Sequence, residues 1–202
     1  MRDWTQYVLL LIDVQQDFWT EKAVSAFPDF PDNVARLLSV CRSEGLEIVH
    51  LRARYKPDMS DWMGLYKLRG RIPCVEGTPG AETLPFALEK PGETVIIKQT
   101  FDGFLTAELL PYLRRSGKRF VLTAGLITSV CVLLTAASAA QRGFLVAVVE
   151  DCCADDPIVH KRTLETYGFI VDHTTADLIP ERHSEWDEWL LELNELDAPL
   201  LR

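Results

Sequence analysis

Six short apolar runs recur along the chain, and longer amphipathic segments separate them. The runs lie at residues 7–14, 46–53, 93–98, 119–126, 144–151 and 168–172. Each run is continuously hydrophobic rather than alternating with polar positions. This pattern is typical of strands that are covered on both faces, as they are in a parallel sheet.

The segments between these runs predict helices of about a dozen residues, an arrangement that indicates βαβ units and an open α/β fold. The predicted helices span residues 31–44, 104–116, 129–142 and 155–166, and three of them are followed by a glycine (Gly45, Gly117 and Gly143) that could act as a C-cap. We predict a single domain over residues 1–202.

A further amphipathic helix is predicted at residues 183–196, within a C-terminal helix and tail at 183–202. Its apolar face consists of Trp186, Trp189, Leu190 and Leu193. This face could pack on the chain's own sheet or on another subunit, and both alternatives remain open at this stage.

One long connection, the long loop (residues 54–81), interrupts the alternation. Long loops in compact α/β domains are uncommon and are often functional. Within residues 52–71, six Lys and Arg side chains stand against two Asp side chains, a local charge of +4 in a chain whose net charge is −9. These cations could form an ordinary solvated surface, or they could belong to a lid that meets an anionic group of a substrate.

Composition narrows the class of protein. The 202 residues are 48% hydrophobic and 25% charged, as in ordinary globular domains. The net charge of −9 argues against nucleic acid or an anionic membrane as a partner. The five cysteines are irregularly spaced and indicate no disulfide framework. No apolar run approaches the roughly 20 residues of a membrane span, and the first residues do not resemble a signal peptide, so we predict a reduced, cytoplasmic protein.

The carboxyl ends of the predicted strands carry candidate chemistry, because ligands bind at this edge of open α/β sheets. Asp13 ends the first strand, Lys98 ends the third, and the fourth leads into the helix that carries Cys131. Taken singly, Asp13 could cap the next element, Lys98 could extend its amine into solvent, and Cys131 could be a core residue. However, Asp13 and Lys98 both end strongly apolar runs, where a charge is costly without a partner, so we predict that they pair near Cys131.

Such a trio would suit nucleophilic catalysis. A nearby ammonium and a helix N-terminus would lower the pKa of the Cys131 thiol, and Asp13 could take the thiol proton and later return it. A dinucleotide site is not indicated, because no Gly-x-Gly-x-x-Gly follows the first strand.

Three segments, "LLLIDVQQDF", "KQTFDGFLTAELLPYLRRSG" and "LTAGLITSVCVLLTAASAAQRGFLVAVVEDCCAD", resemble the isochorismatase-like superfamily of cysteine hydrolases over roughly residues 7–180. The resemblance implies a three-layer α/β/α fold with a six-stranded, mostly parallel sheet, assembled as homodimers or homotetramers. It also implies that Asp13, Lys98 and Cys131 form the catalytic trio.

The same resemblance implies a non-proline cis peptide bond between Leu126 and Ile127. It further implies that the amides of Ile127 and Cys131 form an oxyanion hole. True isochorismate hydrolases of this superfamily lack the cysteine nucleophile. The presence of Cys131 therefore indicates attack on an amide-like carbonyl, with hydrolysis of a C–N bond in a small amide, carbamoyl or ureido compound and with no cofactor.

Nicotinamidases of the superfamily hold a metal through an Asp-x-His pair and a later His, but this chain has His50 alone in that region. No two of its four histidines have ligand spacing, so we predict no metal, and His50 is interpreted as a sheet histidine. Two alternatives remain open: a metal-free nicotinamidase-type amidase, and a catalytically silent binding member of the superfamily.

Side chains near the trio are candidate substrate contacts, and aromatic walls suit a flat substrate, although each aromatic could equally belong to the core. If the substrate bears a carboxylate, Arg54 is the first candidate to bind it. The candidates are Gln15, Phe18, Trp19, Arg54, Trp62, Phe101, Phe104 and Thr128. Among the other thiols, Cys41 is interpreted as core, Cys74 lies in the long loop, and Cys152 and Cys153 are alternative nucleophiles because they follow the fifth strand.

Overall fold

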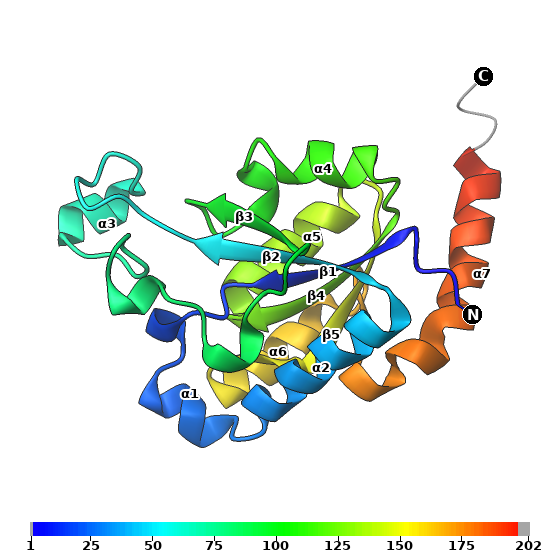
Figure 1. Ribbon diagram of the computed structural model, residues 1–202, viewed down its shortest axis with the longest axis horizontal. Coiled ribbons are helices and arrows are strands. Elements are labelled where there is room, and N and C mark those ends of the chain that lie inside the picture. Colours follow the sequence, from blue (N-terminus) through cyan, green and yellow to red (C-terminus); the bar gives the residue numbers. More distant parts are fainter. Residues whose placement is uncertain (1, 198–202) are drawn as a thin grey trace.

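The computed structural model describes residues 2–197, and its frame is a six-stranded sheet in the order β3-β2-β1-β4-β5-β6 (Figure 1). All neighbouring strands pair in parallel. The strands are β1 (Tyr7–Ile12), β2 (Glu47–Ala53), β3 (Thr94–Lys98), β4 (Phe120–Leu126), β5 (Leu145–Ala154) and β6 (Asp172–Thr174). The predicted α/β class and parallel sheet are confirmed.

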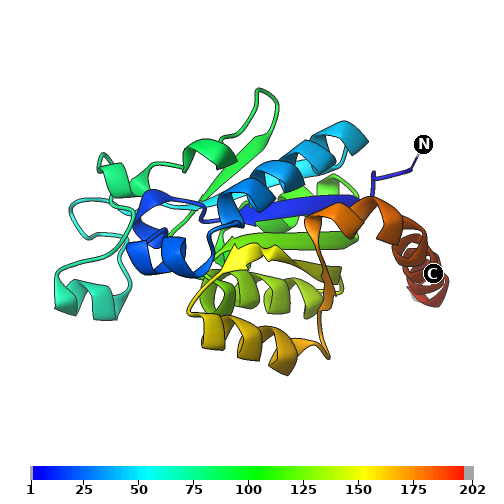
Figure 2. The same ribbon diagram turned by 90° about the horizontal axis from the view of Figure 1, so that it is seen from below.

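Helices cover both faces of the sheet, which gives three layers. They are α1 (Glu21–Ala26), α2 (Phe30–Glu44), α3 (Gly64–Arg69), α4 (Leu109–Arg115), α5 (Leu133–Ala140), α6 (Pro157–Tyr167) and α7 (Ile179–Asp197). Figure 2 shows α2 on one side of the sheet and α5 and α6 on the other. As predicted, α2 ends at Gly45, whose left-handed φ of 73° is typical of a glycine C-cap.

The strand β1 shows why the apolar runs are continuous. Its side chains alternate between two cores: Leu9 and Leu11 pack with α2 and α7, whereas Val8 and Leu10 pack with α4 and α5. All six residues of β1 are buried, because a central parallel strand has no solvent-facing side.

The close approach of β4 to β1 depends on Gly125. Its φ is 121°, and a Cβ atom placed there would lie 2.0 Å from the carbonyl oxygen of Ile12. Only glycine satisfies both constraints, so this residue lets the ends of the two central strands converge at the carboxyl edge.

Several predicted elements were wrong in extent. The predicted helix at 104–116 is a 3₁₀ turn (Gly103–Leu105), capped by the Asp102 carboxylate, and then the shorter α4. The predicted helix at 129–142 begins with a π-helical turn, Thr128–Val132, before α5. The strand predicted at 168–172 begins only at Asp172, because the chain turns after α6 through a hydrogen bond from Ile170 N to Tyr167 O (3.0 Å).

The C-terminal helix is longer than predicted and packs on the chain's own sheet. Trp186 is fully buried against Phe120, with ring centroids 4.9 Å apart, and Leu190 is also buried. The idea that these two side chains serve another subunit is therefore wrong. The last residues of the predicted tail, 198–202, lie outside the described residues. No helix of the described part is long and apolar enough to cross a membrane.

Candidate active site

Asp13 and Lys98 form a buried ion pair at the carboxyl edge of the sheet, where β1 and β3 end. Lys98 Nζ lies 2.6 Å from Asp13 Oδ2 and also donates to the carbonyl of Thr100 (2.8 Å). The second carboxylate oxygen accepts from the backbone N–H of Ala53 (2.9 Å). Asp13 and Lys98 have no exposed surface, and Cys131 is 5% exposed. Hydrogen bonding with both Asp13 and Lys98 contributes to the pKa of the Cys131 thiol, so the three predicted side chains lie together.

The backbone of Asp13 is held in an unusual conformation. Its φ is 50°, in the left-handed region that non-glycine residues seldom adopt. Two backbone hydrogen bonds fix it there, from Asp13 N to Leu51 O and from Gln15 N to Asp13 O, both 2.8 Å long. Strain of this kind persists only where the surroundings determine it and is common at functional sites. Here it directs the carboxylate away from the strand and toward Lys98.

The electrostatics of the trio correct one expectation. Burial raises the pKa of the Cys131 thiol well above its ordinary value, the Asp13 charge raises it further, and the Lys98 ammonium only partly offsets them. The thiol is therefore protonated at rest, rather than preformed as a thiolate. Burial also raises the pKa of Asp13, against the opposing effect of Lys98, which makes this carboxylate a stronger base.

Cys131 lies in a tight segment that we call the Cys131 turn (residues 127–131), between β4 and α5. The peptide bond between Leu126 and Ile127 is cis. The carbonyl of Ile127 then accepts from the N–H groups of Val130 (3.0 Å) and Val132 (3.3 Å), which starts the π-helical turn. Cys131 is therefore in the first turn of the helix, as predicted, with a wider winding than an α-helix has.

Two side chains hold the Cys131 turn, Asp155 from the β5–α6 connection and His160 from α6, and the sequence reasoning did not assign them a role. Asp155 Oδ2 accepts from the backbone N–H of Ser129 (2.9 Å) and from its hydroxyl (2.5 Å). His160 Nδ1 lies 2.9 Å from the hydroxyl of Thr128, which is buried. The signal for Asp155 was available, because it follows a parallel strand at the same edge as Asp13 and Lys98.

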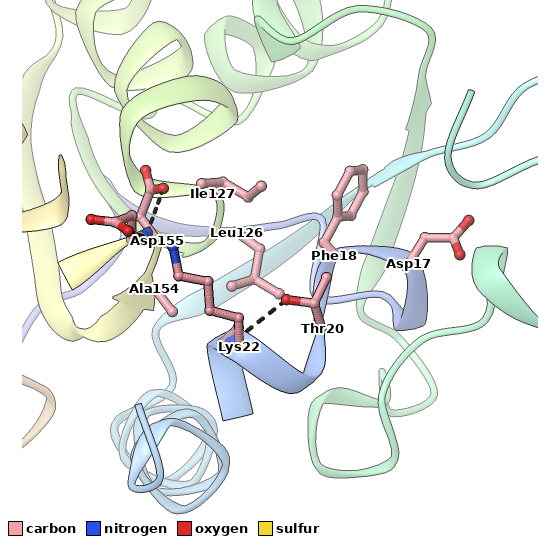
Figure 3. A pocket seen from close by; sticks show the side chains of 10 residues that line it. Asp17, Phe18, Thr20, Lys22, Leu126, Ile127, Ala154 and Asp155 are labelled. Carbon is pink, nitrogen blue, oxygen red and sulfur yellow. Dashed lines mark hydrogen bonds and ion pairs between the residues drawn. The ribbon is translucent and has the colours of Figure 1, made fainter. Parts of the chain in front are cut away.

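A cavity of about 260 Å³ lies beside the Cys131 turn (Figure 3). Its apolar wall includes Phe18, Leu126 and Ile127, and its polar rim includes the ion pair between Lys22 and Asp156 (2.6 Å). The trio itself does not line this cavity. Of the predicted substrate contacts, Phe18 is thus placed beside the turn.

Two other predicted contacts near β1 have structural partners instead. The Gln15 side chain is buried and fully used by the main chain, since it donates to the carbonyls of Ala53 (2.9 Å) and Ala81 (2.8 Å) and accepts from Ala53 N. Trp19 stacks on Phe30 of α2, with centroids 4.8 Å apart. Both side chains therefore have partners within the fold, and a substrate contact of the half-buried Trp19 stays a prediction.

Trp62 and Phe104 lie in buried clusters, and their role as substrate contacts stays a prediction. Trp62 is buried within the long loop and donates through Nε1 to the carbonyl of Lys56 (2.7 Å). Phe104 is buried under α5, with the guanidinium of Arg142 5.2 Å from its ring centroid. Phe104 thus packs toward the far end of α5.

The remaining predicted contacts are Phe101, Arg54 and Thr128. Phe101 is half-buried and faces Tyr66 of α3, with centroids 6.4 Å apart. Arg54 is exposed, and its backbone N–H donates to the carbonyl of Lys98 (3.2 Å). Thr128 belongs to the Cys131 turn.

The other thiols are all buried. Cys41 packs in the core as predicted, and burial raises its pKa to about 12. Cys74 is buried in the long loop. Cys152 and Cys153 lie inside β5 rather than after it, and burial raises the pKa of both. None of these four is placed beside the Asp13–Lys98 pair by a hydrogen bond among the described residues.

His50 is buried in β2 and bonds Glu93 through Nε2 (2.9 Å), as expected of a sheet histidine. Within residues 2–197 there is no group of three or more His, Cys, Asp or Glu side chains that could hold a metal ion.

Comparison with known proteins matches residues 7–165 to the isochorismatase domain. Maleamate amidohydrolase of Pseudomonas putida is 31% identical, over 85% of this chain and 81% of its own length. An isochorismatase family protein of Desulfovibrio vulgaris superposes with a TM-score of 0.79 at 28% identity, over 90% of this chain and 98% of its own. Ureidoacrylate amidohydrolase RutB of Methylorubrum extorquens is 25% identical, over 82% of this chain and 79% of its own length. The chain therefore belongs to the isochorismatase family.

Proposed function

We propose that this protein hydrolyses a carbon–nitrogen bond of a small amide, carbamoyl or ureido compound through a thioester on Cys131. The observation that carries the proposal is the buried Asp13–Lys98 ion pair next to the Cys131 thiol in the first turn of a helix. A carboxylate and an ammonium are costly to bury, and their position beside a thiol gives them a chemical use.

In the first half-reaction, Asp13 takes the proton of Cys131 as the sulfur attacks the substrate carbonyl. The elevated pKa of the carboxyl makes it an effective acceptor. The backbone amides of Ile127 and Cys131 stabilise the oxyanion, and Lys98 keeps Asp13 oriented throughout. The tetrahedral intermediate then collapses, its C–N bond breaks, and the proton held by Asp13 passes to the leaving nitrogen.

In the second half-reaction, Asp13 takes a proton from water, which attacks the thioester carbonyl. The C–S bond breaks, the acid product leaves, and the proton returns to the sulfur. The net reaction consumes one water and releases ammonia or an amine with a carboxylic or carbamic acid. These steps require no group beyond the side chains and amides of the chain.

We further propose that the substrate carries a carboxylate. The names of two relatives, maleamate and ureidoacrylate amidohydrolase, denote amide or ureido compounds that bear a carboxylate. In this chain, Arg54 offers an exposed guanidinium one residue beyond the end of β2, and its N–H is bonded to the residue that ends β3, Lys98. An anionic substrate end would meet it at the carboxyl edge.

The test is a screen of small amides and ureido compounds for released ammonia, with maleamate and ureidoacrylate as its first members. We expect turnover by the wild-type protein and none by Cys131→Ala, with a mass increase on Cys131 when the reaction is quenched early. Cys152→Ala should keep full activity, because that thiol is buried in β5. An active Cys131→Ala protein would refute the mechanism, and a wild type inert to every compound would favour a silent binding protein.

A further inference from the structure

The Cys131 turn is fixed by side chains that come from outside it. Its own backbone closes through the carbonyl of Ile127, which accepts from Val130 N and Val132 N. Asp155, which follows β5, and His160, in α6, supply hydrogen bonds to two successive residues of the turn, Ser129 and Thr128. On the proposed function, this turn carries the nucleophile and both oxyanion donors, so whatever fixes it also fixes the reaction geometry.

Asp155 acts as an N-terminal cap from a distance. The N–H groups of the first turn of a helix have no partner within the helix, and a carboxylate there satisfies them and complements the helix dipole. Asp155 Oδ2 binds both the N–H and the hydroxyl of Ser129, so two donors of one residue converge on one oxygen. Its other oxygen accepts from Asp156 N (2.7 Å), which fixes the carboxylate itself. Both oxygens of the Asp155 carboxylate therefore accept hydrogen bonds.

His160 restrains the preceding residue. Burial lowers the pKa of its imidazole, so the ring is neutral, and Nδ1 can accept from the buried Thr128 hydroxyl when the ring proton is on Nε2. The ring is itself positioned by the edge of Phe27, with centroids 5.2 Å apart. The hydroxyl thus has one fixed partner.

We propose that Asp155 and His160 are positioning residues, which hold the Cys131 turn so that its amides align with the oxyanion. They do not touch the reacting atoms, and they act through Ser129 and Thr128. The proposal rests on the proposed function, because it assigns the turn's amides to the transition state. Interactions that form only in the transition state affect kcat, whereas binding of the ground state affects KM.

Two probes of the same thiol separate this role from a merely structural one. Acylation of Cys131 by p-nitrophenyl acetate passes through a tetrahedral oxyanion and needs the aligned amides. Alkylation by iodoacetamide displaces iodide at a saturated carbon and forms no oxyanion. The rate measured with the Cys131→Ala protein is subtracted from each rate. The two corrected rates then give the reactivity of the Cys131 sulfur in a reaction that needs the oxyanion hole and in one that does not.

We expect Asp155→Ala to slow acylation on the order of 100-fold, as small misplacements of reacting groups do, while alkylation changes less than about 3-fold. Asp155→Asn keeps one oxygen acceptor and should recover most of the acylation rate. For the second contact, Thr128→Val and His160→Leu should each slow acylation about 10-fold, and the double variant should be no slower than either. Thr128→Ser keeps the hydroxyl and should remain close to the wild type.

Glu165→Ala is the matched control, because Glu165 has the same charge and lies in α6 with His160, but it is exposed and pairs with Lys161 rather than with the turn. It should leave both rates unchanged. Equal losses of acylation and alkylation in Asp155→Ala, or wild-type acylation, would overturn the positioning role. A wild type that shows no acylation dependent on Cys131 would instead overturn the proposed function. For an amide found in the screen, kcat should fall in Asp155→Ala with KM nearly constant.

Discussion

The carboxyl-edge site and the long loop are held together in opposite ways. At the site, charged groups are buried, and each is satisfied by named partners: Asp13 by Lys98 and Ala53 N, and Lys98 by Asp13 and Thr100 O. In the long loop, apolar side chains are buried and the charges face solvent. Its small cluster contains Tyr55, Trp62, Ile72 and Cys74, whereas Arg54, Lys56, Arg69 and Arg71 are exposed.

This difference indicates that a charged residue affects the stability of the fold mainly where it is buried. Surface ion pairs contribute little to stability, roughly 0–1 kcal/mol, whereas breaking a buried pair leaves an uncompensated charge. The long loop leaves the sheet at the end of β2 (Figure 1). Its last residue, Ala81, accepts a hydrogen bond from the side chain of Gln15. The loop is held by a neutral hydrogen bond, and its exposed side chains are mostly cationic. We therefore expect its charges to affect the binding of ligands more than the stability of the fold.

The largest effect should come from Lys98→Met. The substitution leaves the Asp13 carboxylate buried without its counter-charge, and we expect a loss of about 3–5 kcal/mol in the free energy of unfolding, measured by urea titration at pH 8. In the variant, burial raises the pKa of Asp13 above its unfolded value. Stability is therefore retained below the unfolded pKa and lost as the pH rises, so the loss should be smaller near pH 4.

The double variant Asp13→Asn, Lys98→Met provides the control. Asparagine tolerates the left-handed φ of residue 13, and the pair is replaced without a buried charge, so most of the stability should return while hydrolysis stays absent. If Lys98→Met alone has the same free energy of unfolding as the wild type, the buried ion pair does not contribute to stability as its burial indicates.

In the long loop, Trp62→Ala should have the next largest effect. Removal of this buried ring, together with its bond to the Lys56 carbonyl, should cost about 3 kcal/mol of local stability. Hydrogen exchange of the Tyr55 and Glu76 amides, which bond across the base of the loop, should accelerate, and limited proteolysis should cut there first.

The matched control is Leu68→Ala, in the same loop but 86% exposed, which should change neither measurement. Global loss of the sheet in Trp62→Ala, rather than local opening, would contradict the view that this cluster is a separate small core.

Glu93 tests whether buried charge matters away from the site. Burial would raise its pKa, but hydrogen bonds from Arg42, Lys90 N and His50 lower it to about 2. Because the folded pKa lies below the unfolded value of 4.5, the stabilisation, on the order of 1–2 kcal/mol after a discount for solvent screening, is present above pH 4.5 and disappears as the pH falls toward 2. The difference in unfolding free energy between wild type and Glu93→Gln should shrink over that range. A constant difference would contradict the pKa shift.

The sequence could predict the trio because each member ends or begins a regular element. Asp13, Lys98 and Cys131 were placed by the rule that parallel strands share a carboxyl edge, and β1, β3 and β4 were recognisable from their apolar runs. The resemblance added the cis bond at Ile127, which no local pattern indicates. The fold class followed from the same runs.

What could not be predicted depends on tertiary contacts between distant residues. Trp62 and Phe104 are aromatic, as are many side chains that line substrate pockets. Only their packing partners in the structure show that they lie in buried clusters. The start of β6 at Asp172 depends on how the chain turns after α6. Asp155 had the right position at the sheet edge, but its bond to Ser129 requires the π-helical turn, which sequence patterns do not distinguish from an α-helix.

Substitution of Arg54 should have the smallest effect on the free energy of unfolding. It tests directly whether the exposed charges of the long loop act on ligands rather than on folding. Its side chain is exposed, so Arg54→Ala should change the free energy of unfolding by less than about 0.5 kcal/mol. If its guanidinium meets a substrate carboxylate, KM for an acidic amide should rise roughly 10-fold or more, while KM for the corresponding neutral amide stays constant. Lys56→Ala, an exposed cation two residues further along, is the control and should alter neither KM. Equal changes for both substrates would show that the loop cations only solvate the surface, and the carboxylate would have to be recognised elsewhere.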